Sequence, residues 1–106
     1  MKYFETRFGG GVASEKIVVA PDLEPLWLAL FDTAADDLVF DLDTPASALP
    51  KLDAAINRLN HDPDSVRHLL PAGANGGLVR RRRVLEQMRR TLADNADASI
   101  SGPLED

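Results

Sequence analysis

The stretch LVRRRRVLEQMRRTLADNA, residues 78–96, decides what kind of fold this chain can adopt. With about 100° of rotation per residue, its apolar side chains gather on one arc of a helix. That arc holds Leu78, Val84, Leu85, Met88 and Leu92, together with Asn95, and the opposite side holds Arg80, Arg83, Gln87 and Arg90. The spacing predicts one amphipathic helix over residues 78–95, with its leucine side docked on a core and its arginine side in water.

The arginines of this predicted helix are unusual because the chain as a whole is acidic. The net charge is −5, yet six of the twelve cationic residues lie between residues 80 and 90. Residues 1–79 carry six cations against twelve acids, a net charge of −6, whereas residues 80–106 carry six against five, a net charge of +1. We therefore expect an acidic body with one basic helix on its surface.

One interpretation of the arginines is an ordinary solvated helix face. Glu86 lies at helical spacing from three of them, namely Arg82, Arg89 and Arg90. Each ion pair of this kind contributes about 0.2–0.5 kcal/mol to an isolated helix. Under this interpretation the arginines only decorate the surface.

The other interpretation is a binding site. The glycine-rich segment 71–77 precedes the helix, so the first backbone N–H groups of the helix are free to bind an anion. Arginine forks suit carboxylates and phosphates. An acidic protein fits better than a nucleic acid, because the acidic body repels a polyanion and no aromatic residue lies near the arginines to stack on a base. The candidate binding residues are Arg80, Arg82, Arg83, Arg89 and Arg90.

Three further segments predict a small β-sheet. Residues 2–8 alternate between two faces, and residues 16–20 form a β-branched run, which together predict an N-terminal hairpin around the three glycines 9–11. Residues 38–43 alternate again, with Leu38, Phe40 and Leu42 on the inward side, and predict a third strand.

The remaining periodic segments predict helices. Residues 23–34 place apolar side chains, including the only tryptophan, at helical spacing. Leu49, Leu52, Ile56 and Leu59 mark a second helix, and residues 64–70 mark a short third one. We therefore expect an α+β fold in which three to four helices pack on a three-stranded sheet made of the hairpin plus one strand, in the order β-β-α-β-α-α-α. Residues 1–96 are expected to form a single domain, and residues 97–106 a flexible tail.

Composition narrows the class of protein. Hydrophobic residues make up 44% of the chain, which favours a folded domain, and the absence of cysteine excludes disulfides and thiolate chemistry. The sequence contains no apolar run long enough to span a membrane, and its first residues do not predict an apolar leader segment. We therefore expect a cytoplasmic protein that does not contact a membrane. Nine arginines against three lysines are typical of a GC-rich bacterium or its phage.

One short motif suggests catalysis. Residues 38–44, LVFDLDT, resemble the first motif of the haloacid dehalogenase superfamily of phosphotransferases. The resemblance implies that Asp41 is a nucleophile and Asp43 a general acid/base, both beside magnesium. The match covers seven residues, and Thr44 follows Asp43 directly where the family has an intervening glycine or a close variant. The more ordinary interpretation is an amphipathic strand with an acidic outer face, so we expect no enzymatic activity.

The two histidines offer no recognised metal site. His61 and His68 lie seven residues apart with Asp62 and Asp64 between them, which is not a zinc-binding spacing, and we expect Asp64 and His68 to pair at a helix end. Neither a metal nor a cofactor is expected.

The sequence thus favours a non-enzymatic accessory or regulatory protein that binds another protein through the arginine helix and the acidic body. The partner is expected to be a different protein or a second copy of the chain, and the gene is expected to belong to a bacterium, a phage or a mobile element. The first alternative is nucleic-acid binding through the helix from Arg80 to Arg90, and the second is a magnesium-dependent phosphatase that uses Asp41 and Asp43.

Overall fold

The computed structural model describes residues 2–9, 13–19, 21–31, 45–74 and 76–105. Its strands are β1 (Lys2–Arg7), β2 (Ala13–Val19) and β3 (Ser99–Glu105), and its helices are α1 (Glu24–Phe31), α2 (Pro45–His61), α3 (Asp64–Arg67) and α4 (Gly77–Asp94), with a 3-10 turn, η1 (Pro21–Leu23), before α1. The predicted class is confirmed, because the described residues form a small α+β fold with one three-stranded sheet and helices packed against it.

The sheet is antiparallel and has the strand order β2-β1-β3. The predicted N-terminal hairpin is present, since β1 pairs with β2 from Lys2 opposite Val19 to Arg7 opposite Ala13. The N-terminal strand therefore lies in the middle of the sheet, with β2 and β3 at its two edges.

The prediction of a flexible tail over residues 97–106 is wrong. Residues Ser99–Glu105 form β3, which pairs with β1 from Lys2 opposite Glu105 to Arg7 opposite Ser99. The predicted strand at 38–43 lies outside the described residues, and the third strand of the observed sheet follows α4. Among the described residues the order is β-β-α-α-α-α-β rather than β-β-α-β-α-α-α.

A bulge explains how β3 accommodates its Gly-Pro pair. Tyr3 lies opposite Leu104 and Glu5 opposite Ser101, so one residue of β1, Phe4, faces two residues of β3, Gly102 and Pro103. Proline and glycine are tolerated at bulges and on edge strands, because a missing ladder hydrogen bond matters least there.

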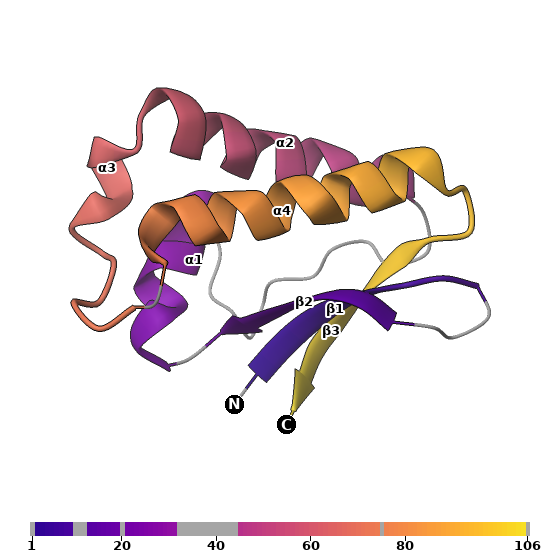
Figure 1. Cartoon of the computed structure of the whole chain (residues 1–106), viewed down its shortest axis with the longest axis horizontal. Helices are drawn as coiled ribbons and strands as arrows, with labels where there is room; N and C mark the ends of the chain where they lie inside the picture. Colours follow the sequence, from indigo (N-terminus) through magenta and orange to yellow (C-terminus); the bar gives the residue numbers. More distant parts are fainter. Residues whose placement is uncertain (1, 10–12, 20, 32–44, 75, 106) are drawn as a thin grey trace.

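The helices lie on one face of the sheet, as Figure 1 shows. The long helices α2 and α4 run side by side; α4 contacts β1 and β2, and α2 contacts β3, whereas α1 sits at one end of the sheet. No helix within the described ranges is long and apolar enough to cross a bilayer.

The core forms where α4 meets the sheet and the other helices. From β1, the residues Phe4 and Thr6 point into it, as the alternation predicted, and Ile100 of β3 lies beside them fully buried. The helices contribute Leu26, Trp27 and Leu30 (α1), Leu52, Ile56 and Leu59 (α2), Val66 (α3) and Leu85, Met88 and Leu92 (α4). Trp27 stacks on Phe31 with ring centroids 5.7 Å apart, which closes the end of the core near α1.

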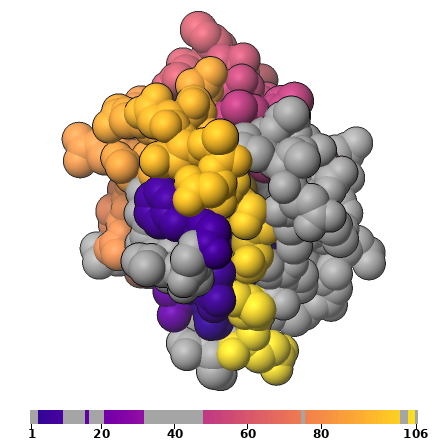
Figure 2. Space-filling view, turned by 90° about the vertical axis from the view of Figure 1, so that its right-hand side faces the viewer, coloured from indigo at the N-terminus to yellow at the C-terminus, as the bar shows by residue number. Residues whose placement is uncertain are grey.

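The end of α4 is held close to the end of β1. Figure 2 shows the last part of α4 and the start of β3 lying against the N-terminal strand. The backbone N–H of Gly9 donates to Asp97 Oδ2 at 3.4 Å, and Asn95 Nδ2 donates to the carbonyl of Thr91 at 2.9 Å. These contacts turn the chain from the helix back into the sheet.

Candidate protein-binding groove

Helix α4 has the two sides that its sequence predicts. Leu78, Leu85, Met88 and Leu92 are buried, and Thr91 is buried beside them. On the opposite side Arg80, Arg83, Gln87 and Arg90 are exposed. The apolar stripe docks α4 on the sheet and on α2, so the orientation of every arginine follows from this docking.

The start of α4 depends on two glycines in the left-handed backbone region. Gly76 has φ 78° and Gly77 has φ 58°, conformations that side chains with a Cβ adopt rarely. At Gly76 an added Cβ would lie 2.6 Å from the Cβ of Arg80, which is shorter than any relaxed contact. The Arg80 side chain can therefore lie against the backbone at position 76 only because glycine has no Cβ.

Four of the six arginines are engaged within the protein. Arg82 lies 3.5 Å from Glu86 Oε1, an ion pair slightly too long to be a hydrogen bond, and it also donates to Asn60 Oδ1 at 3.4 Å. Arg89 forms an ion pair with Asp53 of α2. Arg81 donates to the carbonyl of Gly77 at 3.1 Å, and Arg90 donates to Gln87 Oε1 at 3.3 Å.

The environment of Arg81 differs from that of its neighbours. This arginine falls on the apolar side of α4 and is half-buried. Burial lowers the pKa of its guanidinium, the positive charge of Arg80 lowers it further, and Asp22 acts in the opposite direction. The side chain curls back on its own helix, where it donates to the carbonyl of Gly77.

Arg80 and Arg83 remain. Both are exposed, and neither side chain forms a hydrogen bond or an ion pair with another described residue. Their guanidinium groups therefore keep their full hydrogen-bonding capacity for a ligand. The five predicted binding residues thus divide into Arg80 and Arg83, which are available, and Arg82, Arg89 and Arg90, which already have acceptors inside the protein.

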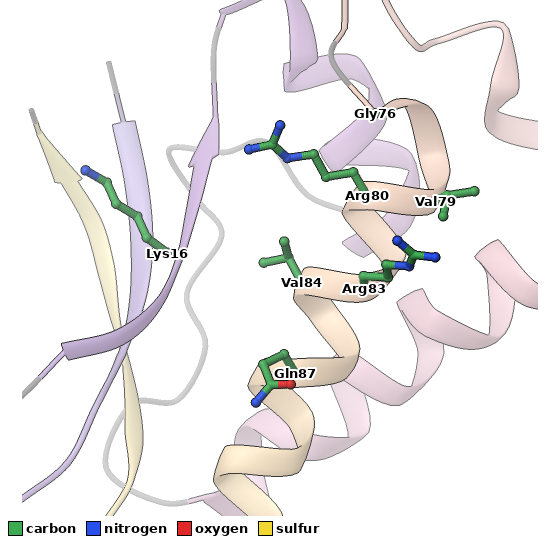
Figure 3. A pocket seen from close by; sticks show the side chains of 7 residues that line it. All are labelled: Lys16, Gly76, Val79, Arg80, Arg83, Val84 and Gln87. Atoms are coloured by element: carbon green, nitrogen blue, oxygen red, sulfur yellow. The ribbon is translucent and has the colours of Figure 1, made fainter.

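A groove of about 400 Å³ lies between this part of α4 and strand β2. It is lined by Lys16, Gly76, Val79, Arg80, Arg83, Val84 and Gln87. In Figure 3 the side chains of Arg80, Val84 and Gln87 point from the helix toward the strand, whereas the side chain of Lys16 points away across the sheet. The amino group of Lys16 lies 4.1 Å from the centre of the Tyr3 ring, so only its stem borders the groove.

The groove combines positive charge with an apolar surface. Val79 is 48% exposed although it sits among arginines, and Val84 is half-buried at the inner wall. The described lining residues include the guanidinium groups of Arg80 and Arg83, and none of these described residues carries a carboxylate. The described lining therefore combines hydrogen-bond donors for an anion with apolar surface.

The sequence interpretation missed the groove residues outside the arginines. Val79 was a detectable signal, because it is an apolar residue on the polar side of the helical wheel. Lys16 and Gly76 gave no such signal, since their place beside α4 follows from the packing of the sheet against the helix.

A second hollow, of about 350 Å³, lies at the start of α4 and is lined in part by Asn60, Arg67, Gly77 and Arg82. Its cations already have acceptors, because Arg67 pairs with Asp64 at 3.1 Å and Arg82 contacts Glu86 and Asn60. This hollow offers a ligand less free positive charge than the groove beside β2.

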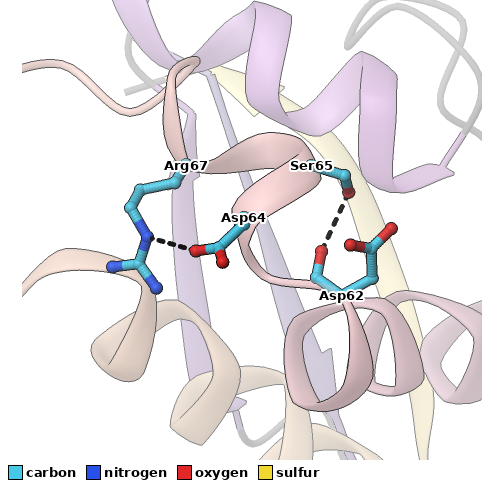
Figure 4. A network of polar contacts seen from close by, with 4 residues as sticks. All are labelled: Asp62, Asp64, Ser65 and Arg67. Carbon is cyan, nitrogen blue, oxygen red and sulfur yellow. Dashed lines mark hydrogen bonds and ion pairs between the residues drawn. The ribbon is translucent and has the colours of Figure 1, made fainter.

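The segment with the two histidines is held by its own polar contacts. In Figure 4, Arg67 turns toward Asp64, and Ser65 Oγ donates to the carbonyl oxygen of Asp62 at 2.8 Å. Asp64 thus pairs with Arg67 rather than with His68 as predicted. Within the described residues no group of three or more histidine, aspartate or glutamate side chains is placed to hold a metal ion. Asp41 and Asp43, the carboxylates of the phosphotransferase-like motif, lie outside the described residues.

Comparison with known proteins gives no match: no family model, curated protein or solved structure resembles this chain at the level of significance applied.

Proposed function

We propose that this protein is a small non-enzymatic binding protein that engages an acidic partner protein through the groove between α4 and β2. One observation carries the proposal: Arg80 and Arg83 stand exposed at an apolar groove, and their side chains have no acceptor among the described residues, whereas the other arginines of α4 do. Surface arginines beside an exposed apolar side chain are typical of the centre of protein interfaces.

An acidic protein suits this groove better than a nucleic acid. Two free arginines would neutralise about two phosphates, far fewer than the 6–10 contacts of a strong DNA-binding surface. None of the described residues that line the groove is aromatic, so none of them offers a ring on which a base could stack. The acidic body, with a net charge of −6 over residues 1–79, also repels a long polyanion.

Site-specific photo-crosslinking in the native cells tests the proposal. A photo-crosslinking amino acid is introduced in place of Val79, and the same amino acid in place of Leu28 serves as the matched control. Both side chains are 48% exposed and apolar, but Leu28 lies on α1. We expect a discrete crosslinked protein from position 79 that is lost when Arg80→Glu and Arg83→Glu are added.

The products distinguish the alternatives. A crosslinked species of twice the chain mass identifies a second copy as the partner. Equal products from positions 79 and 28, or products that persist after both charge reversals, contradict the proposal. A DNA or RNA complex in a gel shift at about 50 mM salt that requires Arg80 and Arg83 would favour nucleic-acid binding instead.

A further inference from the structure

Strand β2 forms one wall of the groove and is also an edge of the sheet. Its one strand neighbour among the described residues is β1. The pairing is regular over four successive positions, from Lys16 opposite Glu5 to Val19 opposite Lys2, and the register shifts only beyond Glu5. From Lys16 onward, β2 therefore has a regular row of backbone N–H and C=O groups along its outer edge that no other described strand pairs with.

Within the part of the chain that the structure describes, β2 has few of the usual protections of an edge strand. Proteins block such edges with prolines, inward-pointing charges, bulges or a covering element. Residues 16–19, KIVV, contain no proline, and the one charged side chain, Lys16, turns across the open face of the sheet to lie over Tyr3. The bulge of β2 lies at the other end of the strand, opposite Thr6.

We propose that the groove binds an extended acidic segment of the partner, which adds to β2 as a fourth strand. This inference rests on the proposed function and specifies how the partner binds. The backbone of the segment pairs with the outer edge of β2, while the side chains that face α4 contact the arginines and valines of the groove. Edge strands are a recurrent platform for peptide binding of this kind.

The spacing of the arginines sets the pattern of the partner. Side chains alternate between the two faces of a strand, so residues i and i+2 face the helix about 6.6–7 Å apart. Arg80 and Arg83 are three residues apart on a helix, and such positions have Cβ atoms about 5–6 Å apart. Two acidic residues at i and i+2 therefore match the spacing of the Cβ atoms of Arg80 and Arg83. The Arg80 side chain already points toward β2, whereas the Arg83 side chain has to turn from the other side of the helix to meet the added strand. An apolar residue at a neighbouring helix-facing position meets Val84.

Fluorescence anisotropy with three labelled peptides tests this inference on the full chain. Each peptide is about eight residues long, the usual length of a short strand. The first places aspartates at i and i+2 and valine at i+4, with threonine elsewhere. The second has the same composition but places the aspartates at adjacent positions, so that they face opposite sides of the strand. The third has the first sequence with alternate backbone amides N-methylated, which prevents strand pairing and keeps every side chain.

We expect the first peptide to bind and the other two to bind about tenfold more weakly or not at all. Arg80→Glu and Arg83→Glu should each weaken the first peptide by about tenfold or more, because each removes a charge-assisted hydrogen bond. Lys51→Glu is the matched control, since it makes the same change in net charge at an exposed position on α2 outside the groove. It should change Kd by about twofold or less. Hydrogen exchange should show new protection of the amides between Lys16 and Val19 on binding.

The outcomes separate this inference from the proposed function. Equal binding of the first and third peptides, or unchanged exchange in β2, overturns strand addition. If binding still depends on Arg80 and Arg83, the proposed function stands. Failure of the first peptide to bind at about 1 mM also overturns the inference, while the crosslinking at Val79 tests the proposed function independently.

Discussion

The guanidinium of Arg89 in α4 donates to the carboxylate of Asp53 in α2, 36 residues earlier in the chain. Both side chains are 45% exposed, so water screens the pair. A double-mutant cycle with Arg89→Ala and Asp53→Ala should give a coupling of about 0.2–1 kcal/mol that falls as salt is added. The measurement is urea denaturation of the four proteins. A coupling near zero would show that the pair does not tie the two helices together.

The buried stripe of α4 should dominate the stability of the fold. Leu85 is fully buried, so Leu85→Ala should lower the free energy of unfolding by about 2–5 kcal/mol. Val79→Ala on the exposed side of the same helix is the control and should change it by no more than about 0.5 kcal/mol. Similar losses at the two positions, measured by denaturation followed by circular dichroism, would mean that α4 does not dock on its leucine side.

The left-handed backbone at Gly76 should make this position intolerant of a side chain. Gly76→Ala forces a Cβ into a φ of 78° and against the Cβ of Arg80, and the expected loss is about 1–3 kcal/mol. At Gly73 nothing lies within 4 Å of an added Cβ, so Gly73→Ala should be neutral within about 0.5 kcal/mol. Equal denaturation midpoints for the two variants would contradict the observed start of α4.

The packing of β3 against the core can be tested by substitutions in this strand. Ile100 is fully buried, and Ile100→Ala should cost about 2–5 kcal/mol of stability. The exposed Glu105 in the same strand is the control, and Glu105→Ala should have an effect within about 0.5 kcal/mol. If residues 97–106 were a flexible tail, neither substitution would change the stability. Thermal denaturation of the two variants therefore discriminates between a strand and a tail.

The helices could be predicted from the sequence because their signal is local. Leu85, Met88 and Leu92 recur at helical spacing, and this spacing alone places them on one side whatever they pack against. The same holds for Leu52, Ile56 and Leu59 in α2. The fold class followed from these periods together with the alternation in residues 2–8.

The third strand of the observed sheet could not be predicted in this way. The segment SISGPLE has few apolar residues, and its glycine and proline are typical of a break in structure. It becomes a strand because β1 offers a free edge and because the bulge opposite Phe4 absorbs both residues. The strand therefore depends on β1, which lies some 95 residues earlier in the chain, and not on its own local sequence.

The candidate site was predicted in part for a similar reason. The sequence identifies the arginines of α4 but not their partners, since Asp53 and Asn60 both come from α2. Which arginines remain available depends on how α2 crosses α4. The edge of β2 adds the second wall of the groove, and that wall too is set by tertiary packing.

The central position of β1 constrains the order of folding during synthesis. Strand β1 is translated long before β3, so it can pair with β2 while its other edge still lacks β3, the second of its partners among the described strands. Until then the nascent chain exposes an open strand edge and an apolar face, which are the features that promote misassembly. The domain therefore completes its sheet only when almost the whole described chain has emerged, and shortened products that lack β3 should be removed by proteolysis or lost to aggregates.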